Sequence, residues 1–306
     1  MDALAPLIAA TLSAGTPLLL AAIGILVHER TGVVNLGIEG MMLLAAVVAF
    51  FTVHVTGSYA LGFAVGALAG VLLAALFAFF ALGLHANQYA TGLALALFGA
   101  GLSSFIGIPL SGVSLPAREA DGIPLLRDLP FVGPALFSLH PLAYLSMALV
   151  VAVAWFLFRT RAGLVLRAVG ESPSSAHALG YSVRGIRLAA LLFGGACAGL
   201  GGAFLSTVYT PLWADSMTAG RGWIALAVVV FATWRPARVV AGAYLFGGMT
   251  MLQLHLQGLG VEISSQVMSM APYAATIVVL AVISRNPHWI RLNMPSSLGK
   301  PFNPNN

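Results

Sequence analysis

Nine long apolar runs most restrict how this chain can fold. A helix needs roughly 20 apolar residues to cross the hydrocarbon core of a bilayer. Only 8% of the 306 residues are charged, against about 25% in soluble domains. The chain therefore has too few charged residues to form a water-exposed surface around these apolar runs. Backbone polar groups in lipid must be satisfied internally, which favours helices. The predicted spans are 4–27, 34–56, 59–83, 88–108, 141–158, 182–208, 222–234, 238–257 and 267–284.

The sequence therefore predicts an all-α, polytopic membrane bundle forming one transmembrane domain over 1–306. Cytoplasmic loops carry an excess of Lys and Arg. If the connection 159–181 is cytoplasmic, 11 of the 14 basic residues fall inside and 3 outside. The amino terminus is then outside and the carboxyl terminus inside. The inside set is Arg30, Arg159, Arg161, Arg167, Arg184, Arg187, Arg235, Arg238, Arg285, Arg291 and Lys300, and the outside set is Arg118, Arg127 and Arg221.

Two connections between spans are long. Residues 109–140 form an extracytoplasmic segment rich in Pro and Gly, which cannot be one helix. Residues 159–181 predict two short amphipathic helices on the cytoplasmic face. Gly170 ends the first, and the second starts with Ser172 as N-cap and Pro173 at the first helical position. Such a surface is suited to a cytoplasmic partner.

Several function classes are disfavoured by what the sequence contains. The net charge of +5 fits the basic cytoplasmic loops rather than a nucleic-acid partner, since no basic cluster is interleaved with aromatics. The single cysteine, Cys197, is read as a small packing residue. The histidines show no metal spacing, and we expect no metal and no cofactor. No Gly-rich phosphate-binding loop is present, so the chain is not expected to hydrolyse ATP or to be an enzyme.

Four stretches resemble a known family of membrane proteins. Residues 32–43 read GVVNLGIEGMML, 87–95 read NQYATGLAL, 160–180 include Arg167-Ala168-Val169-Gly170-Glu171, and 295–302 read PSSLGKPF. Together they are similar to the permeases of ABC importers in the branched-chain amino acid/ribose superfamily, and within it to the nucleoside and simple-sugar branch. The matches extend from about residue 15 to 302.

The resemblance implies a division of labour among subunits of a bacterial plasma (inner) membrane transporter. Two permeases, which are often different chains, form the pathway through the membrane lipid. Cytoplasmic ABC ATPases bind the 159–181 coupling segment, and an extracytoplasmic binding protein delivers the substrate. The expected function is import of a nucleoside or simple sugar by alternating access. The alternative is a self-sufficient secondary transporter of a small polar solute, for which Glu39 is the main ion-coupling candidate.

Polar residues in the spans are the candidate pathway residues. A carboxylate such as Glu39 is costly in a membrane segment and marks function by default. With Asn35, four residues earlier on the same helical face, it either lines the pathway or bonds backbone near glycines. Asn87, Gln88 and Thr91 either line the pathway or cap and join helices.

Two further groups of residues are predicted to contact partner proteins. Asp215 and Arg221 lie outside, where they contact the binding protein or form a surface ion pair. Within 159–181, the residues assigned to ATPase coupling, rather than to an ordinary solvated loop, are Arg161, Gly163, Arg167, Gly170, Glu171, His177 and Gly180.

Overall fold

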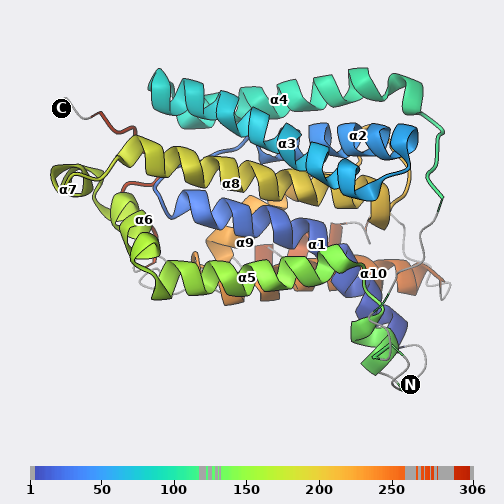
Figure 1. Cartoon of the computed structure of the whole chain (residues 1–306). Helices are drawn as coiled ribbons and strands as arrows, with labels where there is room; N and C mark the ends of the chain where they lie inside the picture. The colour runs from blue at the N-terminus through green and yellow to red at the C-terminus, as the bar shows by residue number, and fades with distance from the viewer. Residues whose placement is uncertain are drawn as a thin grey trace.

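Long helices run alongside one another through the whole molecule (Figure 1). The computed structural model describes residues 4–116, 132–258 and 293–303, together with 122, 126–127, 130, 267, 270–271, 273–275, 277–278 and 281. Two short helices and the carboxyl terminus lie at one end of the molecule, and the amino terminus lies at the other (Figure 1).

The described helices comprise seven that are long and apolar enough to cross a membrane, and three shorter ones. The long helices are α1 (Leu4–Glu29), α2 (Ile38–Thr56), α3 (Tyr59–Ala78), α4 (Gln88–Gly107), α5 (Pro141–Arg159), α8 (Val183–Phe204) and α10 (Pro236–Gly258). The short helices are α6 (Arg161–Glu171), α7 (Pro173–Ala178) and α9 (Arg221–Phe231). Single turns of π-helix, η1 (Phe79–Gly83) and η4 (Leu205–Tyr209), extend α3 and α8; η3 (Gly133–Phe137) precedes α5, and a 3-10 turn, η2 (Ile108–Leu110), follows α4.

The predicted spans agree with these helices, with two differences. The second begins only at Ile38, because residues 33–37 are not helical. The seventh, predicted over 222–234, is the short helix α9, which ends at Phe231. The ninth, 267–284, lies mostly outside the described residues. The two short helices predicted in 159–181 are confirmed as α6 and α7, although α6 ends at Glu171, one residue after the predicted end.

Helix α8 packs against α1, α2 and α3 at close range, and glycines permit it. A Cβ atom added to Gly199 or Gly202 would collide with the backbone of Gly66 on α3 or of Met42 on α2. Membrane helices approach closely through such small residues because apolar burial gives no driving force between helices in lipid.

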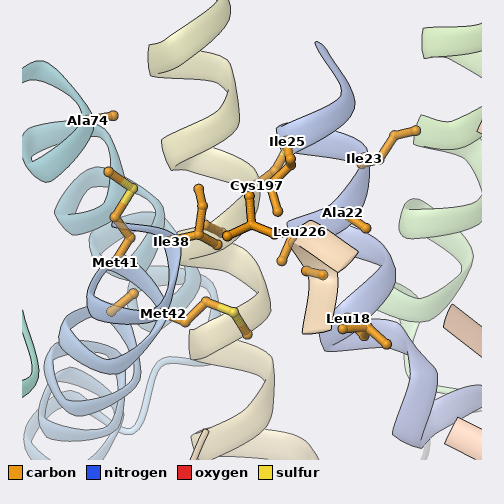
Figure 2. Close-up of a cluster of buried hydrophobic side chains, with 14 of the residues drawn as sticks. Leu18, Ala22, Ile23, Ile25, Ile38, Met41, Met42, Ala74, Cys197 and Leu226 are labelled. Atoms are coloured by element: carbon orange, nitrogen blue, oxygen red, sulfur yellow. The ribbon is translucent and has the colours of Figure 1, made fainter. Parts of the chain in front are cut away.

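The interior where these helices meet is apolar. Figure 2 shows Leu18 and Ile25 of α1, Ile38 and Met42 of α2, Cys197 of α8 and Leu226 of α9 in one cluster. Cys197 is 2% exposed, and a Cβ atom added to Gly24 would lie 2.7 Å from the Cys197 Cβ. This close packing agrees with the interpretation of Cys197 as a packing residue. The outward faces of α3, α4 and α5 stay apolar, with Leu68, Leu97 and Val151 more than half exposed. A surface of this kind is suited to lipid or to another membrane helix.

Candidate functional site

Helix α9 begins inside the bundle, and Glu39 of α2 closes its amino-terminal end. Glu39 Oε1 accepts hydrogen bonds from Gly220 N (2.9 Å) and from the Thr218 hydroxyl. Glu39 Oε2 accepts one from Gly222 N (2.6 Å). The first N–H groups of a helix have no intrahelical partner and carry partial positive charge. A buried carboxylate and an unpaired helix terminus therefore satisfy each other.

Helix α9 is too short to cross a membrane alone. Its 11 residues span about 16 Å, roughly half of a hydrocarbon core of about 30 Å. The far end of α9 leads to Trp234, at the level where α1 ends. Trp234 Nε1 donates to Glu29 Oε2 (2.6 Å), and the Trp234 carbonyl accepts from Arg30 Nε (3.2 Å) and Nη2 (2.8 Å). Both ends of this half-length helix are thus held by side chains that flank the α1–α2 connection.

The segment that enters α9, residues 213–220, is irregular and partly open. Ser216, Ala219 and Gly220 have positive φ angles of 54°, 47° and 80°. Ala214, Asp215, Ser216 and Ala219 are exposed in the single chain. Non-helical backbone at membrane depth is tolerated only where it is buried in protein or lines a water-filled cavity. Exposure of this segment indicates a water-filled cavity or an interface with a second subunit.

Residues 213–220 run along α4 from the carboxyl-terminal end of that helix toward its middle. The Trp213 ring packs on Gly107, the last residue of α4. The Ser104 hydroxyl, one turn earlier, donates to Asp215 Oδ1 (2.5 Å). Gly40, beside Glu39, packs at the level of Ala96 and Gly99, about 10 Å further along α4. This segment therefore runs from the carboxyl-terminal end of α4 to the amino-terminal end of α9.

At the opposite end, Arg187 of α8 joins three segments that are far apart in the sequence. This arginine is 1% exposed. Its Nε donates to the Thr31 carbonyl (3.1 Å), its Nη2 to the Ser297 hydroxyl (3.2 Å) and its Nη1 to the Lys300 carbonyl (3.3 Å). Arg187 thereby fastens the carboxyl-terminal segment to the α1–α2 connection.

Helix α6 contacts Ser297, the same residue that Arg187 contacts. Ser297 donates through its N–H (3.0 Å) and its hydroxyl (2.6 Å) to the Gly170 carbonyl near the end of α6. Ser296 donates through its hydroxyl to Glu171 Oε2 (2.7 Å). A Cβ at Gly170 would collide with the Arg30 carbonyl. The buried contacts of Gly170 link α6 directly to Ser297 and to Arg30 of the α1–α2 connection.

The predicted pathway residues lie in two places. Glu39 is at the amino-terminal end of α9, and the others are near the starts of α2 and α4. Asn35 is not on a helical face with Glu39, which corrects the sequence interpretation. It precedes α2, where its Oδ1 accepts from Gly37 N (2.8 Å) in a turn that replaces the first helical residues. Asn87 is the N-cap of α4, with Oδ1 accepting from the N–H groups of Tyr89 and Ala90.

Gln88 and Thr91 lie beside that cap. Gln88 is 3% exposed, and its Oε1 accepts from Val34 N (2.9 Å), which joins α4 to the α1–α2 connection. Thr91 is half-buried on α4. These contacts match the capping and helix-joining interpretation of Asn87 and Gln88. A role of any of the four amide and hydroxyl residues in the pathway remains a prediction.

The predicted coupling residues lie together on α6, α7 and the turn that follows. Arg161, Glu171, His177 and Gly180 are exposed, and Arg167 is half-buried. Gly163 and Gly170 are buried and permit close packing on Phe156 and Arg30. Asp215 and Arg221 are not paired with each other. Asp215 accepts from Ser104, while Arg221 donates to the Met217 and Thr218 carbonyls and lies over the Tyr209 ring.

Sequence reasoning missed the residues that organise this site. Ser104, Thr218 and Arg187 had no recognisable motif around them, because their partners are 111, 179 and 156 residues away, respectively. A signal was available for α9 alone. Its apolar run is short and follows the sequence Thr218-Ala219-Gly220, and a short, Gly-interrupted apolar segment is a pointer to a discontinuous helix.

Removing the Glu39 carboxylate should destabilise the protein. In Glu39→Ala, two backbone N–H groups and a hydroxyl lose their acceptor, and hydrogen bonds to charged groups are worth about 1.5–3 kcal/mol each. We expect a lower thermal midpoint in detergent for Glu39→Ala, with smaller losses for Glu39→Gln and for Thr218→Val. Equal midpoints for wild type and Glu39→Ala at equal membrane abundance would contradict the cap assignment. Wild-type uptake by Glu39→Gln would remove any direct role of its charge in transport.

Comparison with known proteins places the chain in a family. A family model described as branched-chain amino acid transport system/permease component matches residues 7–283. A putative glucose ABC transporter permease protein of Haloferax volcanii is 41% identical, over 99% of each chain. No solved structure matches the chain.

Two further relatives carry names that concern nucleosides. A nucleoside ABC transporter permease protein of Lactococcus lactis is 35% identical over 87% of this chain and 88% of its own. A guanosine ABC transporter permease protein of Bacillus subtilis is 32% identical over 90% of each. The expected family is thereby confirmed: the chain is a multi-pass membrane protein of the branched-chain amino acid/ribose-type ABC transporter permeases.

Proposed function

We propose that this permease carries a nucleoside or a simple sugar into the cytoplasm by alternating access, driven by a separate ATPase. The observation that carries the proposal is the exposed, irregular segment 213–220, which leads from the outer end to the half-length helix α9. Discontinuous helices near the midplane form the substrate sites of many transporters. The names of the relatives support these two cargo classes.

Nucleosides and simple sugars share neighbouring hydroxyl groups on a ring. Asp215 is an exposed carboxylate whose Oδ1 accepts from Ser104. Carboxylate oxygens accept hydrogen bonds from hydroxyls, and a serine hydroxyl both donates and accepts. We propose that Asp215 and Ser104 contact such hydroxyls as cargo enters. Arg221 supports this segment through the Met217 and Thr218 carbonyls.

The coupling proposal concerns α6, α7 and the turn after α7. Leu179 and Tyr181 in that turn are apolar side chains that are 78% and 44% exposed. Arg161 and Glu171 of α6 and His177 of α7 are exposed polar residues. Exposed apolar side chains combined with polar ones are typical of a protein interface. We propose that the cytoplasmic ATPase binds here. Buried contacts from Gly170 to Ser297, and from Ser297 through Arg187 to Thr31, connect this surface to the α1–α2 connection.

The defining experiment is uptake by a reconstituted complex of this chain with its ATPase, its companion permease and its binding protein. We expect nucleoside or sugar accumulation that requires ATP and stops with a hydrolysis-deficient ATPase. Uptake by this chain alone, driven by an ion gradient, would instead establish the secondary transporter.

Asp215→Asn should weaken cargo handling while leaving assembly intact. Loss of one charged hydrogen-bond acceptor is expected to raise the KM for uptake by about ten-fold. The matched control is Ser111→Ala, an exposed polar residue outside the segment. If Asp215→Asn lowers affinity for the binding protein and leaves uptake from saturating binding protein unchanged, Asp215 is a docking residue instead.

Gly170→Val should uncouple ATP hydrolysis from transport, because the added side chain must displace α6 from the Arg30 carbonyl. Glu171→Gln should give a milder effect through its contacts with Ser296. We expect ATPase activity in the complex to continue while uptake falls several-fold. Thr56→Ala, exposed at the far end of α2, serves as the control. Normal uptake by a Gly170→Val complex that assembles fully would refute the coupling assignment.

A further inference from the structure

A cavity lies at the end of the molecule where α6 joins α5, apart from the proposed pathway. Its volume is about 450 Å³, and its lining combines arginines with apolar side chains. The lining residues are Arg30, Phe158, Leu164, Arg167, Ala168, Glu171 and Asn293. It is separate from residues 213–220, which lead to the opposite end of α9.

Two guanidinium groups lie over one aromatic ring in this cavity. The Cζ atom of Arg167 is 5.1 Å, and that of Arg30 is 6.0 Å, from the centroid of the Phe158 ring. Arg30 is 7% exposed and is fixed by the carbonyls of Trp234 and Asn293. Two cations held at one ring repel each other, so an anion between them is favourable.

The charge around the cavity is positive among the described residues. Arg235 lies close enough to Arg30 to act on it electrostatically, and Glu171 is the one acidic group among the lining residues. Burial, together with the charges of Arg167 and Arg235, lowers the pKa of Arg30 to about 10, so it stays charged at neutral pH. One Glu171 oxygen is already engaged by Ser296.

One hydrogen-bond donor of Arg167 is buried without an acceptor among the described residues. Its Nε is buried and has no hydrogen-bond partner in the described part of the chain. A buried unpaired donor is costly, and the cost is higher for a charged group. Phosphate oxygens suit a guanidinium because they accept hydrogen bonds and carry charge.

The apolar part of the lining indicates what the phosphate group belongs to. Phe158 is 44% and Leu164 is 59% exposed, so the arginines open onto apolar surface at the cytoplasmic end of a spanning helix. A free phosphate ion would leave this apolar surface exposed, whereas the acyl chains of a phospholipid would cover it. Clusters of basic residues at the cytoplasmic ends of membrane helices attract anionic lipids.

We propose that this cavity binds the phosphate group of an anionic phospholipid, with Arg167 and Arg30 as its ligands. A lipid there would touch α6 at Leu164 and Ala168 and the α1–α2 connection at Arg30. It would thereby connect the membrane to the helix that we assign to ATPase coupling. The lipid site itself does not depend on that assignment.

Native mass spectrometry of the full-length protein in detergent tests the site. Phosphatidylglycerol and phosphatidylcholine with the same acyl chains are titrated onto wild type, Arg167→Gln, Arg167→Lys and Arg159→Gln. Arg159 is exposed, next to Phe158 in sequence and outside the cavity lining. Arg159→Gln therefore removes the same charge from the same end of the molecule.

Wild type and Arg159→Gln should retain phosphatidylglycerol in preference to phosphatidylcholine. Arg167→Gln should lose at least about five-fold of that retention, the factor for one basic contact near a membrane surface, and Arg167→Lys should keep part of it. An unchanged thermal midpoint for Arg167→Gln confirms that it is folded.

Four results would overturn the proposal. The first is equal retention of the two lipids by wild type, and the second is equal loss in Arg159→Gln and Arg167→Gln. The third is displacement of phosphatidylglycerol by millimolar inorganic phosphate, which would make the cavity a free-phosphate site. If Arg167→Gln weakens retention of the ATPase but leaves lipid retention unchanged, the arginine is a protein contact and the lipid site is wrong.

Discussion

A buried carboxylate in a membrane protein needs partners that remain in place, and for Glu39 these include the first N–H groups of a helix. Glu39 accepts from Gly220 N, Gly222 N and the Thr218 hydroxyl. The same contact satisfies an unpaired helix terminus that would otherwise also be costly in lipid. It therefore permits α9 to begin halfway across the bundle. The irregular segment before α9 then follows α4 from the carboxyl-terminal end of that helix.

The opposite end of α9 is connected to the end of the molecule that carries α6 and α7. Trp234 contacts Glu29 and Arg30, and the adjoining α1–α2 connection contacts Arg187. Arg187 and Ser297 extend these contacts to Gly170 of α6. A displacement of α6 can therefore reach both ends of α9 through buried hydrogen bonds rather than through flexible loops. This is a physical basis for the proposed transmission from an ATPase to the pathway.

The sequence predicted the helical bundle, most of its spans and the two short helices α6 and α7, because apolar length and the Ser172-Pro173 cap are local signals. It also predicted the family, from short motifs. It could not predict that Glu39 caps α9, since that contact joins residues 179 to 183 positions apart. The placement of Asn35 was wrong for a local reason, because its side chain forms a turn with Gly37 instead of extending α2. The proposed pathway role of Asp215 and Ser104 also depends on a contact between distant segments.

Thiol accessibility most directly tests whether the segment before α9 lines an aqueous pathway. Cys197, the single native cysteine, is 2% exposed, so its background reaction is low. Introduced thiols react with water-soluble reagents only where the thiolate can form. We predict that Ser216→Cys and Ala219→Cys are labelled in assembled complexes, that cargo slows the labelling, and that Leu97→Cys on the apolar face of α4 is not labelled. Absence of labelling at both positions 216 and 219, in complexes that still transport, would contradict the account.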